Sequence, residues 1–168
     1  HHGFRGTVYA GYRGNLPPWV EKTKQVLFAE NLKAEEFLVT EDLSIVFVKL
    51  TTDFHLSNYK PFFAQQVKKS CNMSVGAQFY FDPDIVLKCS WSFFEEWVKM
   101  GVALVNEKIN HDMGSNHPTR VMWKEILREN GYKCNQVLSS YINAGFFGIP
   151  MSDESFLEVF GRLIIYSQ

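Results

Sequence analysis

The sequence predicts an α/β domain built on a mainly parallel sheet with helices on both faces, of the Rossmann-like type. Short runs of β-branched and aromatic residues alternate with segments of helical character, as in successive βαβ units. The 168 residues are enough to bury one hydrophobic core. No linker, internal repeat or low-complexity tract divides them. We therefore assign residues 1–168 to a single domain.

Composition restricts the class of protein. Hydrophobic residues make up 46% of the chain and charged residues 21%, a balance that excludes a disordered chain. The net charge is -1, and no run of Lys or Arg is longer than two residues. A nucleic-acid-binding protein usually carries a basic stripe or a recognisable module. Neither is present, so we expect no nucleic-acid partner.

Cysteine spacing and hydropathy bear on the cellular location. The three cysteines are far apart and form no C-x-x-C pair, which indicates reduced thiols rather than a disulfide framework. No apolar stretch is long enough for a transmembrane helix, and no signal peptide is evident. These features predict a cytoplasmic location, either free or peripheral to a membrane.

The first half of the chain provides two strands and two helices. Gly6–Tyr12 is rich in β-forming residues and predicts a strand. A helix is expected at Val20–Asn31 after a proline turn, and Ser44–Leu50 has the β-branched, apolar character of a buried strand. A second helix is expected from Ser57, its N-cap, to Ser70. Pro61 is placed in the first turn of that helix, where backbone amides lack partners within the helix.

The second half continues the alternation. Ala77–Phe81 predicts another buried strand, and Ser152 is expected to cap a final helix. The elements between them are a helix with a capping box at Ser92-x-x-Glu95, a strand at Val102–Val105, a helix from Pro118 to Gly131, and an apolar, glycine-containing segment at Tyr141–Ile149.

The most informative motif is Asp82-Pro83-Asp84, which directly follows the strand Ala77–Phe81. In an open parallel sheet, ligands bind beyond the carboxyl ends of the strands. Pro83 is expected to hold Asp82 in an extended conformation, so that both carboxylates project to one side with Cα atoms ~6.6 Å apart. Such a pair suits Mg²⁺ or Mn²⁺. The alternative is a plain surface turn, since Asp and Pro are common turn residues.

This motif also carries a family resemblance. Phe79–Val86 resembles the D-x-D segment of GT-A glycosyltransferases, in which a strand ends in two aspartates that hold a metal ion against a nucleotide-sugar diphosphate. Other stretches resemble bacterial members in the same order, namely Gly6–Gly14 with Leu16–Trp19, Asn58–Pro61, Asn116–Arg120 and Tyr141–Gly148. Together these stretches span most of the chain.

The resemblance implies a metal-dependent transfer of a sugar from a nucleotide-diphospho-sugar donor to a sugar, lipid or protein acceptor. Mn²⁺ or Mg²⁺ would be the cofactor. Asp84 would be the principal metal ligand, and Asp82 would contact the metal or the ribose. Asn143-Ala144-Gly145 matches the loop that borders donor and acceptor, with Asn143 and Asp82 as the catalytic candidates. The alternative for Asn143 is a structural turn.

Two departures from the family pattern matter. Only one strand precedes the first expected helix, and it resembles the second strand of the family. The chain also stops at Gln168, before the acidic or His residues that usually complete the site. The resemblance therefore implies a partial domain, and we expect little transferase activity from it.

Other assignments remain open. Arg13 lies between two glycines after a strand and could bind phosphate as a bidentate donor, or it could be a solvated loop residue. Asp82-Pro83-Asp84-Ile85-Val86 also fits the D-x-D-x-V motif of haloacid-dehalogenase-type phosphatases, although no Asp-Asp or Gly-Asp pair follows downstream. A third possibility is a non-catalytic GT-A-like module that binds a nucleotide sugar or a protein.

Overall fold

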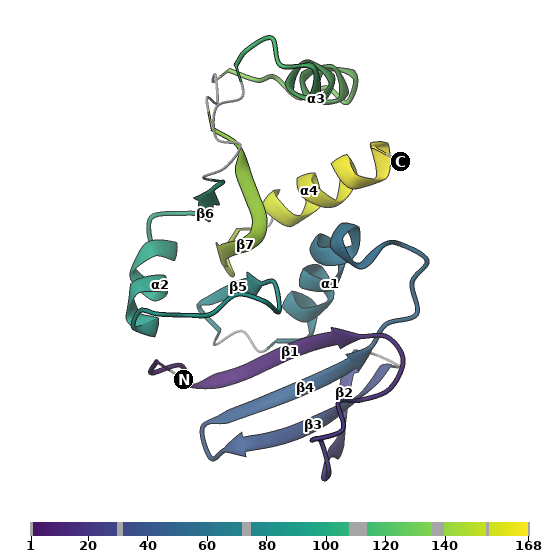
Figure 1. Ribbon diagram of the computed structural model, residues 1–168, viewed down its shortest axis with the longest axis vertical. Coiled ribbons are helices and arrows are strands. Elements are labelled where there is room, and N and C mark those ends of the chain that lie inside the picture. The colour runs from purple at the N-terminus through teal and green to yellow at the C-terminus, as the bar shows by residue number, and fades with distance from the viewer. Residues whose placement is uncertain are drawn as a thin grey trace. The chain divides into compact units, whose positions relative to one another are not determined.

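The computed structural model describes residues 2–29, 32–71, 75–107, 114–135, 140–153 and 155–167. These residues form two compact units. The first consists of the chain up to Val75 together with Leu87–Phe93, and the second consists of Gly76–Val86 together with the chain from Phe94 onward. Each unit has its own sheet (Figure 1).

The sheet of the first unit is mixed, with one parallel pair of strands. Its strands are β1 (Gly6–Tyr12), β2 (Lys24–Ala29), β3 (Leu32–Thr40) and β4 (Leu43–Lys49), in the order β1-β4-β3-β2. Only β1 and β4 run parallel, because β2 and β3 form an antiparallel pair inserted between them in the sequence. The prediction of a mainly parallel, Rossmann-like sheet was therefore wrong.

The helix expected at Val20–Asn31 was also wrong, because its described part contains β2. Phe28 is buried and Val26 is partly buried, whereas Lys24, Gln25 and Leu27 are exposed. That alternation has the period of two that is typical of a half-buried strand. The strand β3, which pairs with β2, was not predicted at all.

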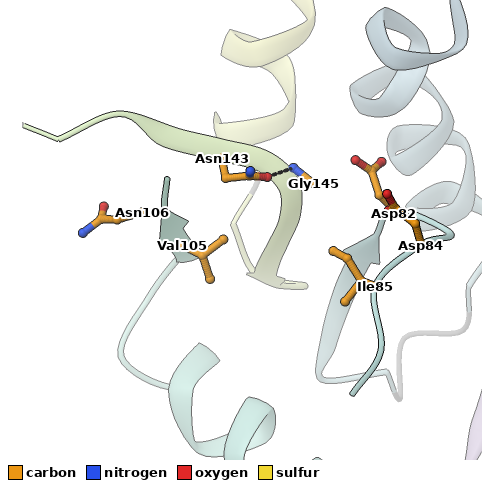
Figure 2. A pocket seen from close by; sticks show the side chains of 7 residues that line it. All are labelled: Asp82, Asp84, Ile85, Val105, Asn106, Asn143 and Gly145. Atoms are coloured by element: carbon orange, nitrogen blue, oxygen red, sulfur yellow. Dashed lines mark hydrogen bonds between the residues drawn. The ribbon is translucent and has the colours of Figure 1, made fainter. Parts of the chain in front are cut away.

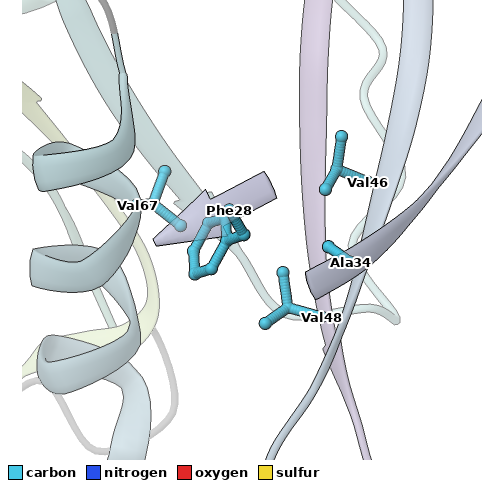
Figure 3. Close-up of a cluster of buried hydrophobic side chains, with 5 residues drawn as sticks. All are labelled: Phe28, Ala34, Val46, Val48 and Val67. Carbon is cyan, nitrogen blue, oxygen red and sulfur yellow. The ribbon is translucent and has the colours of Figure 1, made fainter. Parts of the chain in front are cut away.

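One face of this sheet is covered by α1 (Leu56–Ser70), which Figure 1 shows alongside the strands. The buried cluster consists of Phe28, Ala34, Val46 and Val48 from the strands and Val67 from α1 (Figure 3). Val48 is completely buried. Burying a Val or Phe side chain contributes roughly 1.5–3 kcal/mol, so this cluster provides the driving force for docking the helix on the sheet.

The start of α1 differs from the prediction. His55, rather than Ser57, is the N-cap, and its Nδ1 accepts a hydrogen bond from the backbone N–H of Ser57 at 3.3 Å. Pro61 lies inside the helix, beyond the first turn, and is fully buried. The sequence thus located the helix start to within two residues but assigned the cap to the wrong polar side chain.

The sheet of the second unit is antiparallel. Its strands are β5 (Ala77–Phe81), β6 (Ala103–Asn106) and β7 (Ile142–Pro150), in the order β5-β7-β6. Three helices accompany them, α2 (Trp91–Val98), α3 (Pro118–Glu129) and α4 (Ser155–Tyr166), of which α2 begins in the first unit. Ala77–Phe81 and the helix start at Pro118 match the predictions. The apolar segment Tyr141–Ile149, to which no secondary structure was assigned, contains most of β7.

Aromatic rings pack on both faces of this small sheet. On one face, Phe94 and Trp97 of α2 contact Phe146, with ring centroids 5.7 and 5.5 Å apart. On the other face, Phe156 of α4 contacts Phe147, with centroids 5.8 Å apart. Because side chains alternate along a strand, the neighbouring residues 146 and 147 serve opposite faces. These aromatic side chains therefore form the packing between the sheet and its helices.

Two predicted helix caps were wrong. Ser92 lies within α2 and not before it. The residue that caps α4 is Asp153, whose Oδ1 accepts hydrogen bonds from the backbone N–H groups of Ser155 and Phe156 at 2.9 and 3.0 Å. Over the residues that the structure describes, every helix is too short or too polar to cross a bilayer.

Candidate functional site

A pocket in the second unit combines residues that are far apart in the sequence. The strands β6 and β7 and the segment that follows β5 contribute to it (Figure 2). Its volume of about 390 Å³ is in the lower part of the range of small-molecule sites. The lining residues are Asp82, Asp84 and Ile85 after β5, Val105 and Asn106 on β6, and Asn143 and Gly145 on β7.

Asp82 and Asp84 belong to a turn that directly follows β5. The backbone N–H of Ile85 donates to the carbonyl of Asp82 at 3.0 Å, which closes the four residues 82–85 as a β-turn. Asp and Pro are favoured at the first two positions of such a turn. The extended path expected through Pro83 and Asp84 was therefore wrong, because these are the two central residues of the turn, although both carboxylates do line one pocket. Asp82 is only the first residue of the turn, and its extended conformation stays a prediction. The turn therefore forms part of the pocket wall.

The carboxylate of Asp82 is held by the strand that precedes it. Tyr80 donates its hydroxyl to Asp82 Oδ1 at 2.5 Å, and the Tyr80 ring stacks on Phe147 with centroids 5.0 Å apart. Burial, followed by the hydrogen bond to Asp82 and the charges of Asp82 and Asp84, raises the pKa of Tyr80 well above its ordinary value. The hydroxyl therefore stays protonated near neutral pH and remains a donor to the carboxylate.

An irregularity in the β6–β7 pairing places Asn143 in the pocket. Val105 pairs with Asn143, but the preceding residue Leu104 pairs with Phe147, so one step along β6 corresponds to four along β7. Bulges of this kind re-aim side chains and are frequent next to functional sites. Within the irregular stretch, Asn143 Oδ1 accepts a hydrogen bond from the backbone N–H of Gly145 at 2.7 Å (Figure 2).

Gly145 lies so close to the pocket side chains that a β-carbon would collide with them. A Cβ at this position would lie 2.8 Å from Asn143 Oδ1 and 3.1 Å from Asp82 Oδ2. The carbonyl of Gly145 also accepts a hydrogen bond from the backbone N–H of Asp82 at 2.8 Å. Gly145 thus ties the acidic turn to Asn143, and only a residue without a side chain permits that spacing.

Glu107 was missed by sequence reasoning. Its Oε2 accepts a hydrogen bond from Asn143 Nδ2 at 2.6 Å, and its backbone N–H donates to the carbonyl of Tyr141 at 2.8 Å. The only available signal was a charged residue two positions after the apolar run 102–105. That signal is weak, because a charge at the end of a strand is usually solvated.

The remaining predicted site residues lie elsewhere. Ala144 is exposed and is not part of the pocket lining. Arg13 belongs to the first unit, where its guanidinium donates to the backbone carbonyls of Thr52 and Phe54, the latter at 2.6 Å. The Arg13 side chain therefore organises a loop of the first unit. Its role toward phosphate stays a prediction.

The carboxylates of the pocket fit a divalent cation. Among the residues that the structure describes, no group of three or more His, Cys, Asp or Glu side chains is arranged to hold a metal ion. Mg²⁺, however, is typically held by one or two carboxylates, with phosphate and water oxygens completing its coordination. Asp82 and Asp84 supply that number of carboxylates in one pocket.

Comparison with known proteins gives no family assignment. The chain matches no protein-family model, no curated protein and no solved structure. Any functional assignment consequently rests on the pocket and on the residues that build it.

Proposed function

We propose that this pocket binds a divalent cation together with the diphosphate of a nucleotide sugar, and that it serves sugar transfer from that donor. One observation carries the proposal. Asp82-Pro83-Asp84 and Asn143-Ala144-Gly145, which the family resemblance links to metal and donor sugar, lie about 60 positions apart in the sequence. Asp82, Asp84, Asn143 and Gly145 nevertheless line the same pocket.

Each side chain has a distinct part in this proposal. Asp84 is exposed at the turn and suits the principal cation ligand, while Asp82 is oriented by Tyr80 and suits a second ligand or a ribose contact. A bound Mn²⁺ or Mg²⁺ would supply Lewis-acid stabilisation of the diphosphate leaving group. An amide has two N–H donors and two acceptor lone pairs, so Asn143 keeps capacity for sugar hydroxyls beyond its two protein hydrogen bonds.

The phosphatase alternative has less support. It requires Asp82 to attack phosphorus with one carboxylate oxygen. Tyr80 donates to Oδ1 of this carboxylate, and Oδ2 lies close to Gly145. A carboxylate that is oriented by Tyr80 and has its other oxygen beside the Gly145 backbone suits the role of an oriented ligand better than that of a nucleophile. Among the residues that the structure describes, the pocket lining also contains no Lys to accompany such a nucleophile.

Calorimetry tests the binding step directly. UDP, GDP and ADP are titrated into the protein with and without Mn²⁺, and at least one of them is expected to bind only when Mn²⁺ is present. Asp84→Ala should abolish the Mn²⁺-dependent binding of the nucleotide. It should not lower the melting temperature, because the side chain is exposed. Asp53→Ala, at an exposed Asp of the first unit, is the matched control and should bind like the wild type.

Two outcomes would contradict the proposal. Equal nucleotide binding with and without Mn²⁺ would show that no cation takes part in binding. Unchanged binding by Asp84→Ala would show that the acidic turn does not contribute to the site. A non-catalytic binding module would give the same calorimetry as an enzyme. Release of free sugar from UDP-, GDP- or ADP-sugars, measured on the same protein, distinguishes the two.

A further inference from the structure

Glu107 is the charged residue nearest to the end of β6, and its backbone is fixed on β7. Asn106 pairs with Ile142, and the next backbone N–H, that of Glu107, donates to the carbonyl of Tyr141 at 2.8 Å. This anchoring brings the Glu107 carboxylate to Asn143, where Oε2 accepts from Nδ2 at 2.6 Å. A hydrogen bond to an ionised carboxylate is roughly twice as strong as one between neutral groups.

The two hydrogen bonds of Asn143 determine which way its amide points. Oδ1 receives the backbone N–H of Gly145, and Nδ2 donates to Glu107. Rotating the amide by half a turn would set Oδ1 against the Glu107 carboxylate and the NH₂ group against the Gly145 N–H. Both pairs would repel, because acceptor would face acceptor and donor would face donor.

The same bonds connect Glu107 to the acidic turn. From its carboxylate, hydrogen bonds run through the Asn143 side chain to the N–H of Gly145, and from the carbonyl of Gly145 to the N–H of Asp82. Glu107 is the one charged acceptor in this series. Its loss would free the Asn143 amide to rotate and would weaken the link that follows.

We propose that Glu107 is a positioning residue, which fixes the Asn143 amide and through it the Gly145–Asp82 link, without itself binding the cation. The proposal rests on the function proposed above only where nucleotide-sugar binding is concerned. The hydrogen-bond geometry can be tested in the protein without any ligand.

The test compares three variants of the whole chain by ¹⁵N-resolved NMR. Glu107→Ala removes the acceptor, and Glu107→Gln keeps an acceptor oxygen but loses the charge. Asn143→Ser serves to assign the Asn143 side-chain resonances by their disappearance. In Glu107→Ala we expect the Asn143 side-chain NH₂ signals to shift, and hydrogen exchange at the Gly145 amide to become about fivefold to tenfold faster. Glu107→Gln should restore wild-type exchange to within about twofold, because its amide oxygen can still accept from Nδ2.

A second measurement separates positioning from cation binding. The affinity for Mn²⁺ alone is measured by electron paramagnetic resonance on the same proteins. Neither Glu107 variant should change it by more than about twofold, because the Gly145–Asp82 link is made by backbone groups that both variants keep. Loss of a cation ligand should cost about tenfold or more. Should Glu107→Ala fail to fold, Glu107→Asp shortens the side chain by one methylene and is expected to give the same NMR changes.

The outcomes are distinct. Unchanged Asn143 and Gly145 signals in Glu107→Ala would overturn the positioning role. Equal losses of Mn²⁺ affinity in Glu107→Ala and Glu107→Gln would make Glu107 a cation ligand and would also overturn it. A wild-type protein that binds no Mn²⁺ contradicts the proposed function, while the NMR comparison still decides the role of Glu107.

Discussion

Adding one methyl group at Gly145 should disturb the pocket more than any other single change of that size. The new Cβ of Gly145→Ala would lie 2.8 Å from Asn143 Oδ1 and 3.1 Å from Asp82 Oδ2. Both distances are shorter than ordinary carbon–oxygen contacts, so the two side chains must move by a few tenths of an ångström. Their movement would strain the hydrogen bond from Gly145 N–H to Asn143 Oδ1.

The expected cost follows from these two effects. Overpacking by one methylene typically costs about 1–3 kcal/mol. Weakening one neutral hydrogen bond adds roughly 0.5–1.5 kcal/mol, but the two effects share the same movement and do not simply add. We expect the free energy of unfolding to fall by about 2 kcal/mol, which corresponds to a drop in melting temperature of about 4–8 °C for a chain of this size.

Urea unfolding of Gly145→Ala beside a matched control measures this cost. Gly76→Ala makes the same substitution in the same unit, at a position where a Cβ would meet no heavy atom within 4 Å. That control should be unchanged or more stable by up to about 1 kcal/mol, because alanine restricts the unfolded chain. The affinity for Mn²⁺ should also be lower in Gly145→Ala than in the wild type, whereas Gly76→Ala should bind Mn²⁺ as the wild type does. Equal stability of the two variants would refute the close packing of Gly145 against Asn143 and Asp82.

Two further predictions concern titration and capping. Burial, followed by the charge of Cys71 and a hydrogen bond with it, raises the pKa of Tyr9 from 10.0 to about 12. Because the folded pKa is the higher one, the stabilisation is complete below pH 10 and is lost as the pH rises toward 12. Tyr9→Phe should therefore flatten the fall in unfolding free energy over that window, and a wild-type slope in the variant would argue against the shift. Asp153→Ala should cost about 1 kcal/mol in urea unfolding by removing the cap of α4, whereas Ser152→Ala should change little. A larger loss of unfolding free energy in Ser152→Ala than in Asp153→Ala would show that Ser152 caps the helix.

The sequence predicted local structure better than strand pairing. Gly6–Tyr12 and Ala77–Phe81 coincide with β1 and β5, since a dense run of β-branched or aromatic residues reports a strand whatever its partner. The parallel sheet was not predictable in this way, because the direction of pairing depends on which strands become neighbours. The hairpin β2–β3, which lies between β1 and β4 in the sequence, makes the pairs β2–β3 and β3–β4 antiparallel.

Helix caps show a second limit of sequence reasoning. Ser57 and Ser152 were expected to cap helices, yet His55 and Asp153 do so. In each case the true cap lies within two residues of the predicted one, and it also carries a hydrogen-bond acceptor. Composition therefore located the helix start, but the choice between adjacent polar residues depends on backbone geometry that a sequence does not display.

The acidic turn shows how the two interpretations of Asp82-Pro83-Asp84 combine. The surface-turn alternative is correct for the backbone, because Ile85 N–H closes the turn on the Asp82 carbonyl. A turn in this place also presents both carboxylates to the pocket, since Asp82 N–H is already bound to the carbonyl of Gly145 on β7. The pairing of β5 with β7 thus fixes where the turn begins, and the turn fixes where Asp84 projects. The presence of turn-forming residues is consequently no argument against a ligand site, and the decisive feature is the strand partner on which the turn rests.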